Sequence, residues 1–459
     1  MNAIKLTYIT LGATLLFSSC SQEEIINHGN AGSDRRIIFH TALPAVTTRS
    51  QVITKEKLTS FQLTAFNPED ENLINKETGH LKRYIESELL NKEDDNPISS
   101  EKCSWPEPGR EGNQLDFFAF YPPLSESDAT SENSPKLVNN SKVTDNGITL
   151  DYKMENFSVA EDITDQIDFL TAHATGSMEE NLFSGISLTF RHQLSRIEVK
   201  AKGSHKSCDI EIAGVRITNV PMQGNFEFQT SDPDGTWTGI TKGNAEYIFR
   251  EGDAIVTVGA NEVSILGGKI DGSNDNCALL IPTTDAAWDY TNDVSNSRKG
   301  IYLNVLLRII DKTPTTGKGK VQYPYYDNSQ GLNAMNIPRE YFAIVTATST
   351  VSKRLYKNGN DYYSDTALTQ PYTLASGEEI REYGWAALPV SANWQPGYSY
   401  SYTLDYTYGV GVHGPDVTGN VSPKAGDPII SDIIGVTVSV NEWQGLNGST
   451  THTVEVPGA

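Results

Sequence analysis

Residues 186–226 alternate regularly between apolar and polar positions. From Ile186 to Leu194 every second residue belongs to one set, which alternates with polar neighbours: Ile186, Leu188, Phe190, His192 and Leu194. In a pleated strand these side chains lie on one face, and that face is predicted to be buried. Beyond Ser195 the alternation resumes out of phase, at Ile197 and Val199. One inserted residue restores the facing, so the pattern predicts a β-bulge at Ser195 or Arg196. A turn at residues 202–204 then leads into a second strand that starts near Cys208.

Shorter runs of the same kind predict strands through both halves of the chain, separated by Gly, Asn, Asp and Pro. The charged stretch 69–95 has apolar residues at loosely helical spacing and predicts one peripheral helix. A polar joint at residues 176–181 predicts a domain boundary. The further expected strands are 36–42, 58–65, 114–121, 148–152, 167–172, 254–259, 262–266, 278–281, 301–310, 341–348, 398–408, 433–443 and 451–456.

Composition agrees with an all-β protein. The 459 residues exceed one ordinary domain and suit two or three, and 37 Gly, 21 Pro and 21 Tyr favour strands and turns over helices. A formal net charge of -22 argues against nucleic acid or an anionic membrane surface as an electrostatic partner, because both are themselves negative.

The first 19 residues have the pattern of a secretory signal. One cation, Lys5, precedes an apolar run at 9–17 that is too short to span a bilayer. The run ends in Leu-Phe-Ser-Ser before Cys20, which resembles the lipobox of bacterial lipoproteins and implies lipidation of Cys20, with a plain cleaved signal as the alternative. Residues 20–35 are polar and are expected to form a tether; their acidic start resembles that of lipoproteins sent to the outer face of the Bacteroidetes outer membrane.

Three cysteines remain besides Cys20. At most one disulfide can form among Cys103, Cys208 and Cys277, and Cys208 with Cys277 is the pair to test. The simpler interpretation is that all three are small buried apolar side chains.

The candidate motifs for cofactor or metal binding lack the neighbouring residues or elements that such sites require, and common catalytic motifs are missing from the sequence. The glycines at 409, 411 and 414 fit a dinucleotide pattern, but Pro415 follows where a helix should begin. The start of a calcium loop at 271–275 lacks its later ligands. No HExxH or GxSxG occurs, and His192, on an apolar strand face, is expected to be a hydrogen-bonded core residue. We therefore expect no enzyme, no metal and no cofactor.

Several segments together resemble the fimbrillin family, the type V pilins of Bacteroidales. They are the lipobox, IIFHTALP with TTRS, LTSFQLTAF, LDFFAFYPP, IDFLTAHA, FRHQLSRIEVKAKG, DIEIAGVRITNVPMQGNF, WQPGYSYSYTL and VTVSVNEWQ, in this order. The resemblance implies two tandem transthyretin-like β-sandwiches. On this chain they fall at residues 36–180 and 181–459.

The resemblance also implies assembly into a surface fimbria, with an adhesive role. A trypsin-like, arginine-specific protease cuts after Arg49, and the strand at 37–44 leaves. Its place is taken by a strand from another pilin subunit, with 433–440 or 451–456 as the donor. The expected location is the outer membrane and cell surface, through the lipid anchor on Cys20.

A monomeric outer-membrane lipoprotein that binds a glycan or a host protein is the alternative function. A glycan-cleaving enzyme has no support in the sequence. A discrete protease cut followed by SDS-resistant ladders distinguishes the pilin from the monomer.

Overall fold

The computed structural model of the chain describes residues 35–43, 58–92, 98–107, 114–124, 133–145, 147–230, 235–248, 255–266, 277–291, 299–312, 321–322, 340–345, 352–358, 360–415, 424–430, 434–442 and 454–455. The chain divides into two compact units, Met1–Arg35 and Arg36–Ala459. All elements below belong to the second unit. Cys20, Arg49 and the possible calcium loop at 271–275 lie outside the described residues.

The described chain is almost entirely β-structure, so the predicted all-β class is confirmed. Helical turns are short: α1 (Met178–Asn181), η1 (Glu71–Leu73) and η3 (Ile163–Asp165). The division into two sandwiches near residue 180 stays a prediction. Strands from both sides of that position share a sheet, because β8 (Tyr152–Ser158) pairs with β13 (Cys208–Phe228).

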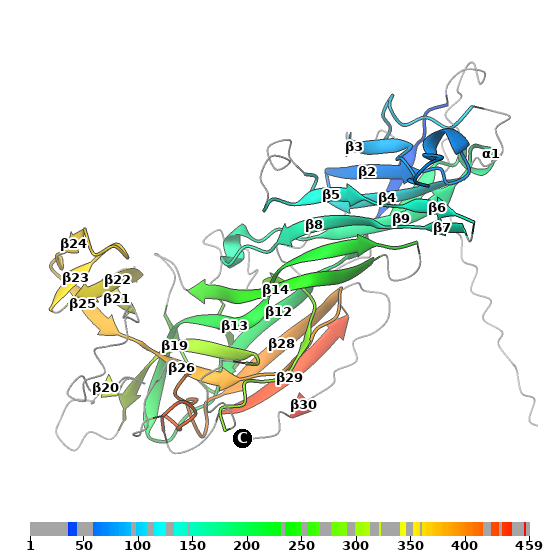
Figure 1. Ribbon diagram of the computed structural model, residues 1–459. Coiled ribbons are helices and arrows are strands. Elements are labelled where there is room, and N and C mark those ends of the chain that lie inside the picture. Colours follow the sequence, from blue (N-terminus) through cyan, green and yellow to red (C-terminus); the bar gives the residue numbers. More distant parts are fainter. Residues whose placement is uncertain are drawn as a thin grey trace, which may run out of the picture. The chain divides into compact units, whose positions relative to one another are not determined.

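One five-stranded sheet is buried on both faces (Figure 1). On its central strand, Phe117 faces one hydrophobic cluster and Phe118 faces another. A strand with both faces buried reads as a continuous apolar run, which explains the dense aromatic sequence LDFFAFY. The strands, in order, are β11 (Arg191–His192), β9 (Leu170–Gly176), β4 (Leu115–Tyr121), β2 (Ser60–Phe66) and β3 (Ile85–Asn91).

Two larger sheets share the main core. The first has the order β16 (Val263–Ser264), β12 (Ser195–Lys202), β28 (Tyr398–Asp405), β29 (Gly435–Glu442) and β30 (Val454–Glu455), with β17 (Ala278–Leu280) also paired to β12. The second has the order β20 (Val321–Gln322), β19 (Tyr302–Asp311), β13, β8 and β5 (Lys136–Asn139), joined by β14 (Gly235–Ile248), β15 (Val256–Thr257) and β26 (Gly384–Pro389).

The remaining strands form small sheets. A five-stranded sheet has the order β24 (Pro371–Tyr372), β23 (Asp361–Tyr363), β22 (Ser352–Asn358), β21 (Glu340–Val345) and β25 (Glu378–Glu382). Three two-stranded pairs are β6 (Lys142–Thr144) with β7 (Gly147–Thr149), β18 (Thr284–Asp285) with β27 (Ala392–Asn393), and β1 (Phe39–Ala42) with β10 (Ile186–Thr189).

The broken alternation at residue 195 marks a change of sheet. Phe190, Leu194, Ile197 and Val199 are all buried, as expected. The predicted single bulged strand is wrong, because the segment forms three strands: β10 pairs with β1, β11 with β9, and β12 with β17 and β28. The change of phase arises because the chain leaves one sheet and enters another around residue 194.

Three other expectations are corrected. The stretch 69–95 contains β3 and no long helix among its described residues, because its apolar side chains pair with β2 across a sheet. Residues 358–374, where no strand was expected, contain β23 and β24. The strand expected at 398–408 ends early, because β28 ends at Asp405 and Tyr408 beyond it is 68% exposed.

The three described cysteines, Cys103, Cys208 and Cys277, are buried and not disulfide-bonded. Cys208 and Cys277 both remain thiols, so the pair proposed for testing does not form. The Sγ atom of Cys208 lies 3.1 Å from Nδ1 of His205. The burial expected in the simpler interpretation is confirmed for all three cysteines, but Cys208 also makes this polar contact and so is not a purely apolar side chain.

Candidate functional site: the strand β1 and its surroundings

The strand β1 alternates between buried and exposed side chains. Ile37 and Phe39 are fully buried, whereas His40 and Ala42 are exposed. Leu43, just beyond the strand, packs partly buried against the same cluster. Burying Ile37 and Phe39 contributes about 1.5–3 kcal/mol each relative to leaving them in water.

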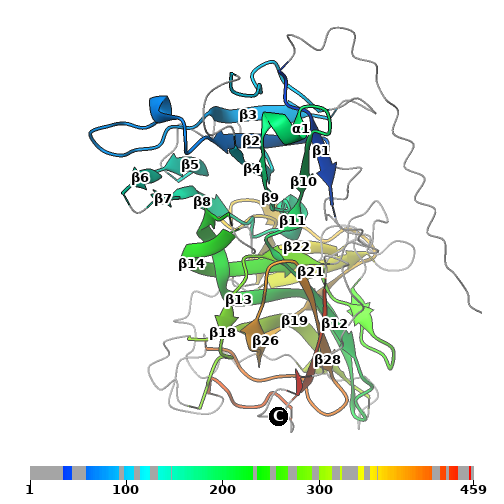
Figure 2. The same cartoon turned by 90° about the vertical axis from the view of Figure 1, so that its right-hand side faces the viewer.

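Backbone hydrogen bonds hold β1 on both sides (Figure 2). On one side it runs parallel to β10, where the amide of Ile186 donates to the carbonyl of Ile38, just before β1, and the amide of Phe190 donates to the carbonyl of Ala42, each at 2.8 Å. On the other side the amides of Ile37 and Phe39 donate to carbonyls of segment 98–104, the acceptors being Cys103 and Ile98, again at 2.8 Å. The segment that contains β1 is therefore bonded on both sides, by a parallel strand on one side and by isolated bridges on the other.

Aromatic rings line the inner face of β1. Phe39 meets Phe117 edge-on at a centroid distance of 5.7 Å, and Trp105 meets the same ring at 6.1 Å. Phe61 of β2 contacts Phe190 at 5.3 Å. We call β1, β10, segment 98–105 and the cluster of buried residues beneath them the β1 site.

A glycine permits the close approach of β1. Gly185 has a φ of +69°, and a Cβ there would lie 2.8 Å from the carbonyl oxygen of Ile38 and 2.9 Å from the His40 ring. Only glycine combines this backbone conformation with that approach.

Cys103 is a thiol covered by the β1 site. It is buried in the same cluster as Ile37 and Phe39, and its carbonyl accepts the Ile37 amide. Burial, reinforced by the Glu88 carboxylate, raises the pKa of the Cys103 thiol to about 12, although nearby Lys102 opposes the change. Because the thiolate is the reactive form, this thiol is inert while β1 is in place.

The opposite face of the same sheet has a separate core. Phe118 and Phe120 belong to the main cluster together with Tyr152, whose hydroxyl lies 2.8 Å from the Thr64 hydroxyl. None of these residues is in the cluster beneath β1. Removing β1 therefore uncovers one face of the sheet and leaves the packing of the other face intact.

The two C-terminal strands differ in how firmly they are paired. The strand β29 pairs with β28 along all eight of its residues, from Tyr398↔Glu442 to Asp405↔Gly435. The strand β30 pairs with β29 only through Thr437↔Glu455 and Val438↔Val454. Detaching β30 costs far fewer described hydrogen bonds than detaching β29.

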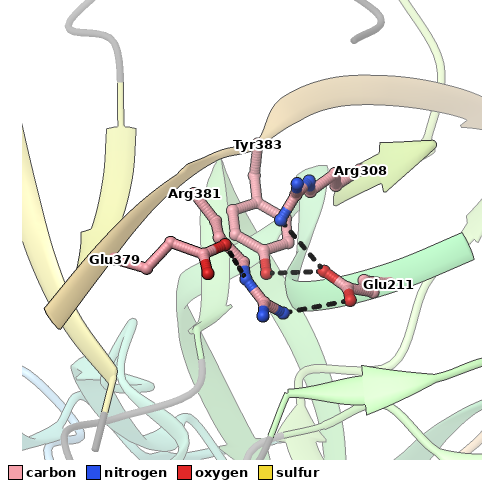
Figure 3. Close-up of polar contacts among 5 residues, drawn as sticks. All are labelled: Glu211, Arg308, Glu379, Arg381 and Tyr383. Carbon is pink, nitrogen blue, oxygen red and sulfur yellow. Dashed lines mark hydrogen bonds and ion pairs between the residues drawn. The ribbon is translucent and has the colours of Figure 1, made fainter. Parts of the chain in front are cut away.

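A polar cluster joins the small sheet containing β25 to the body (Figure 3). The Glu211 carboxylate on β13 contacts Arg381 at 3.1 Å, Arg308 at 3.6 Å and the Tyr383 hydroxyl at 3.2 Å. Arg381 also bonds Glu379 at 2.8 Å. Burial first and the Glu211 charge second raise the pKa of Tyr383, so its hydroxyl stays protonated and donates. Two carboxylates balance two guanidinium groups, as in a structural clamp.

Neither a metal-ligand cluster nor a membrane-spanning helix is found in the part of the chain that the structure describes. No three His, Cys, Asp or Glu side chains there lie close enough to hold a metal ion. No described helix is long and apolar enough to cross a membrane. The glycines at 409–414 precede no described helix; Val412 instead forms backbone bonds with Ala387.

The sequence located only part of this site. The strand expected at 36–42 contains β1, while Arg49 and Cys20 lie outside the described residues. Neither wall of the site was predicted from the sequence, since segment 98–104 received no assignment and β10 was not matched with β1. The apolar Cys103 and Trp105, two residues apart in a polar stretch, were the available signal for the first wall.

Comparison with known proteins identifies the family of the chain. The profile of the fimbrillin-like family matches residues 48–443. The chain belongs to the fimbrillin-like family. Membership indicates a fimbrial or adhesive role at the cell surface and assembly with other pilin subunits. The search of curated proteins gave no match.

Solved structures similar to this fimbrillin-like chain include candidate cell adhesion proteins. One from Parabacteroides distasonis is 8% identical, with a TM-score of 0.40, over 90% of this chain and 100% of that one. Another from Bacteroides eggerthii is 10% identical, with a TM-score of 0.34, over 90% and 98%. A candidate adhesin from Bacteroides ovatus is 9% identical, with a TM-score of 0.31, over 92% and 96%.

Proposed function

We propose that this chain is a structural subunit of a surface fimbria that polymerises by donor-strand exchange. An arginine-specific protease cuts after Arg49, β1 leaves with the released segment, and a strand from another subunit replaces it. The lipid on Cys20 holds the precursor at the outer membrane until the cut. The observation that carries the proposal is that β1 is bonded on both sides and buried over one independent core.

Removal of β1 creates a site that only another strand can fill. The amides of Ile186 and Phe190 and the carbonyls of Ile98 and Cys103 lose their partners together. Buried backbone groups without partners are costly, and an uncovered aromatic cluster is unfavourable in water. An incoming extended segment with alternating apolar residues satisfies both requirements by β-augmentation.

The two-residue pairing of β30 supports segment 451–456 as the donor. Taking β30 out of its sheet leaves β28 and β29 paired over their full length. Taking out β29 instead removes eight paired positions from the main sheet. The subunit therefore keeps its core when 451–456 is donated.

The thiol of Cys103 provides the test. The mature protein is treated with a trypsin-like protease in the presence of a thiol-alkylating reagent, and labelled peptides are mapped by mass spectrometry. We expect a discrete cut after Arg49, alkylation of Cys103 in the cut monomer, and renewed protection in SDS-resistant polymers. Cys208 and Cys277, buried elsewhere, stay unlabelled and serve as internal controls.

An Arg49→Ala variant should resist the cut, keep Cys103 protected and stay monomeric. A wild-type protein that is cut yet remains monomeric at high concentration, with Cys103 protected, would contradict the proposal and favour the monomeric surface lipoprotein.

A further inference from the structure

The indole of Trp105 is buried in the β1 site with its N–H unsatisfied. Its side chain is 1% exposed, and Nε1 has no hydrogen-bond partner among the residues that the structure describes. A buried donor without an acceptor costs roughly 1–3 kcal/mol, so this arrangement works against the state in which β1 is in place.

Trp105 lies at the end of the site where β1 begins. It directly follows Ser104, which pairs with Arg36 in an antiparallel bridge, the outermost described pair at this end. Its ring contacts Phe117, the same ring that packs against Phe39. Trp105 therefore lies beside the end of the site at which a replacement strand would begin, on a ring that β1 also contacts.

We infer that Trp105 is a specificity-determining residue of the β1 site: its N–H bonds an acceptor on the strand of a second copy that replaces β1. The inference rests on the proposed strand exchange. The resident strand leaves this donor unsatisfied, and a replacement that supplies an acceptor gains a bond that β1 does not make.

The C-terminal segment of a second copy has suitable chemistry. A strand keeps all four backbone bonds of the site when it runs in the direction of β1. A donated strand in that direction, with Val454 over the buried cluster, would bring the preceding residues to the Trp105 end. These are Thr451, His452 and Thr453, which carry hydroxyl and imidazole acceptors.

The test uses Trp105→Phe in the full-length protein, with Trp394→Phe as the matched control. Trp394 is also buried, but its Nε1 donates to the Tyr402 hydroxyl at 2.9 Å. Both variants lose the same volume, so the difference between them reports the hydrogen bond.

In the uncut protein, we expect Trp105→Phe to lower the urea midpoint less than Trp394→Phe, because no bond is lost. In polymers of the cut protein, we expect Trp105→Phe to speed dissociation in SDS by about tenfold, the effect of one hydrogen bond, while Trp394→Phe dissociates at the wild-type rate.

Equal urea midpoints for the two variants, or wild-type dissociation of Trp105→Phe polymers, would overturn the inference. Failure of the wild-type protein to polymerise would overturn the proposed function itself and the inference with it. The urea comparison uses uncut protein, so it tests separately whether the Trp105 N–H is already hydrogen-bonded before the cut.

Discussion

At the scale of single residues, the most buried polar pair is His192 with Asp168. Their side chains are fully buried, and Nδ1 of His192 lies 2.8 Å from Oδ2 of Asp168, where the chain passes between two sheets. Asp168→Ala is expected to lower the free energy of unfolding by about 1–3 kcal/mol, because it leaves a buried imidazole N–H without this acceptor. Urea denaturation measures the loss.

Asp116→Ala is the control for this substitution. Its carboxylate contacts His173 at 3.3 Å in a partly exposed setting. A change below about 1 kcal/mol is expected there. An equal loss for both variants would show that the depth of burial does not set the cost.

His413 should make stability depend on pH. Burial lowers its pKa from 6.5, and the nearby Asp427 carboxylate only partly opposes this shift. Below pH 6.5 the unfolded chain binds a proton that the folded chain does not. The free energy of unfolding is therefore unaffected by His413 above pH 6.5 and decreases as the pH is lowered further. Unfolding by urea at pH 7.5 and 5.5 should show a smaller pH-dependent loss for His413→Gln than for wild type. An unchanged loss would rule out this residue as a cause.

The sequence was informative about residues whose surroundings are local. The core role of His192 and the burial of Phe190 to Val199 were predicted from alternation alone. Tyr408 was predicted incorrectly because the alternation continues past Asp405, where the strand ends, and periodicity does not show where a partner strand stops. The unsatisfied N–H of Trp105 has no signature in the sequence, since it depends on atoms brought together by folding.

At the scale of elements, Gly185 controls how β1 docks. Gly185→Ala should cost about 1–2 kcal/mol from the left-handed backbone and more from the clash with the Ile38 carbonyl. We expect faster alkylation of Cys103 in the uncut protein, because β1 is displaced. Gly147→Ala is the control, with a φ of +109° and no atom within 4 Å of the added Cβ. Equal labelling of Cys103 in both variants would contradict this role.

Deleting residues 451–459 should separate stability from assembly. The described part of this segment adds two paired positions to β29, so the urea midpoint is expected to stay near that of wild type. Polymerisation after the cut should be lost, because the donor is missing; size-exclusion chromatography and SDS gels report it. Normal ladders from the truncated protein would assign the donor to 433–440.

Elements were easier to predict than their partners. The alternation around Phe39 and Ile186 predicts two strands, but their parallel pairing joins segments far apart in the sequence. Segment 98–104 escaped prediction because it bonds β1 through isolated bridges and not through a regular ladder. Its sequence therefore has no strand pattern.

At the scale of the whole molecule, the all-β class and the fimbrillin-like family follow from the order of many weak segments. Which strands share a sheet does not follow from that order, because strands such as β8 and β13 pair across the predicted boundary near residue 180. A pattern of apolar positions shows which face of a strand is buried but not which sheet buries it. The proposed strand exchange depends on which sheet buries each strand, since β1 covers one of two independent cores.

Hydrogen–deuterium exchange at the amides of Ile186 and Phe190 tests strand exchange most directly. Both amides donate to the segment that contains β1 in the uncut subunit, while the Gln193 amide donates to Phe169 and serves as the reference. We predict slow exchange at Ile186 and Phe190 before the cut, fast exchange in the cut monomer, and slow exchange again in the polymer, with Gln193 slow throughout. Continued protection after the cut, or fast exchange in the polymer, would contradict the replacement of β1 by a strand from another subunit.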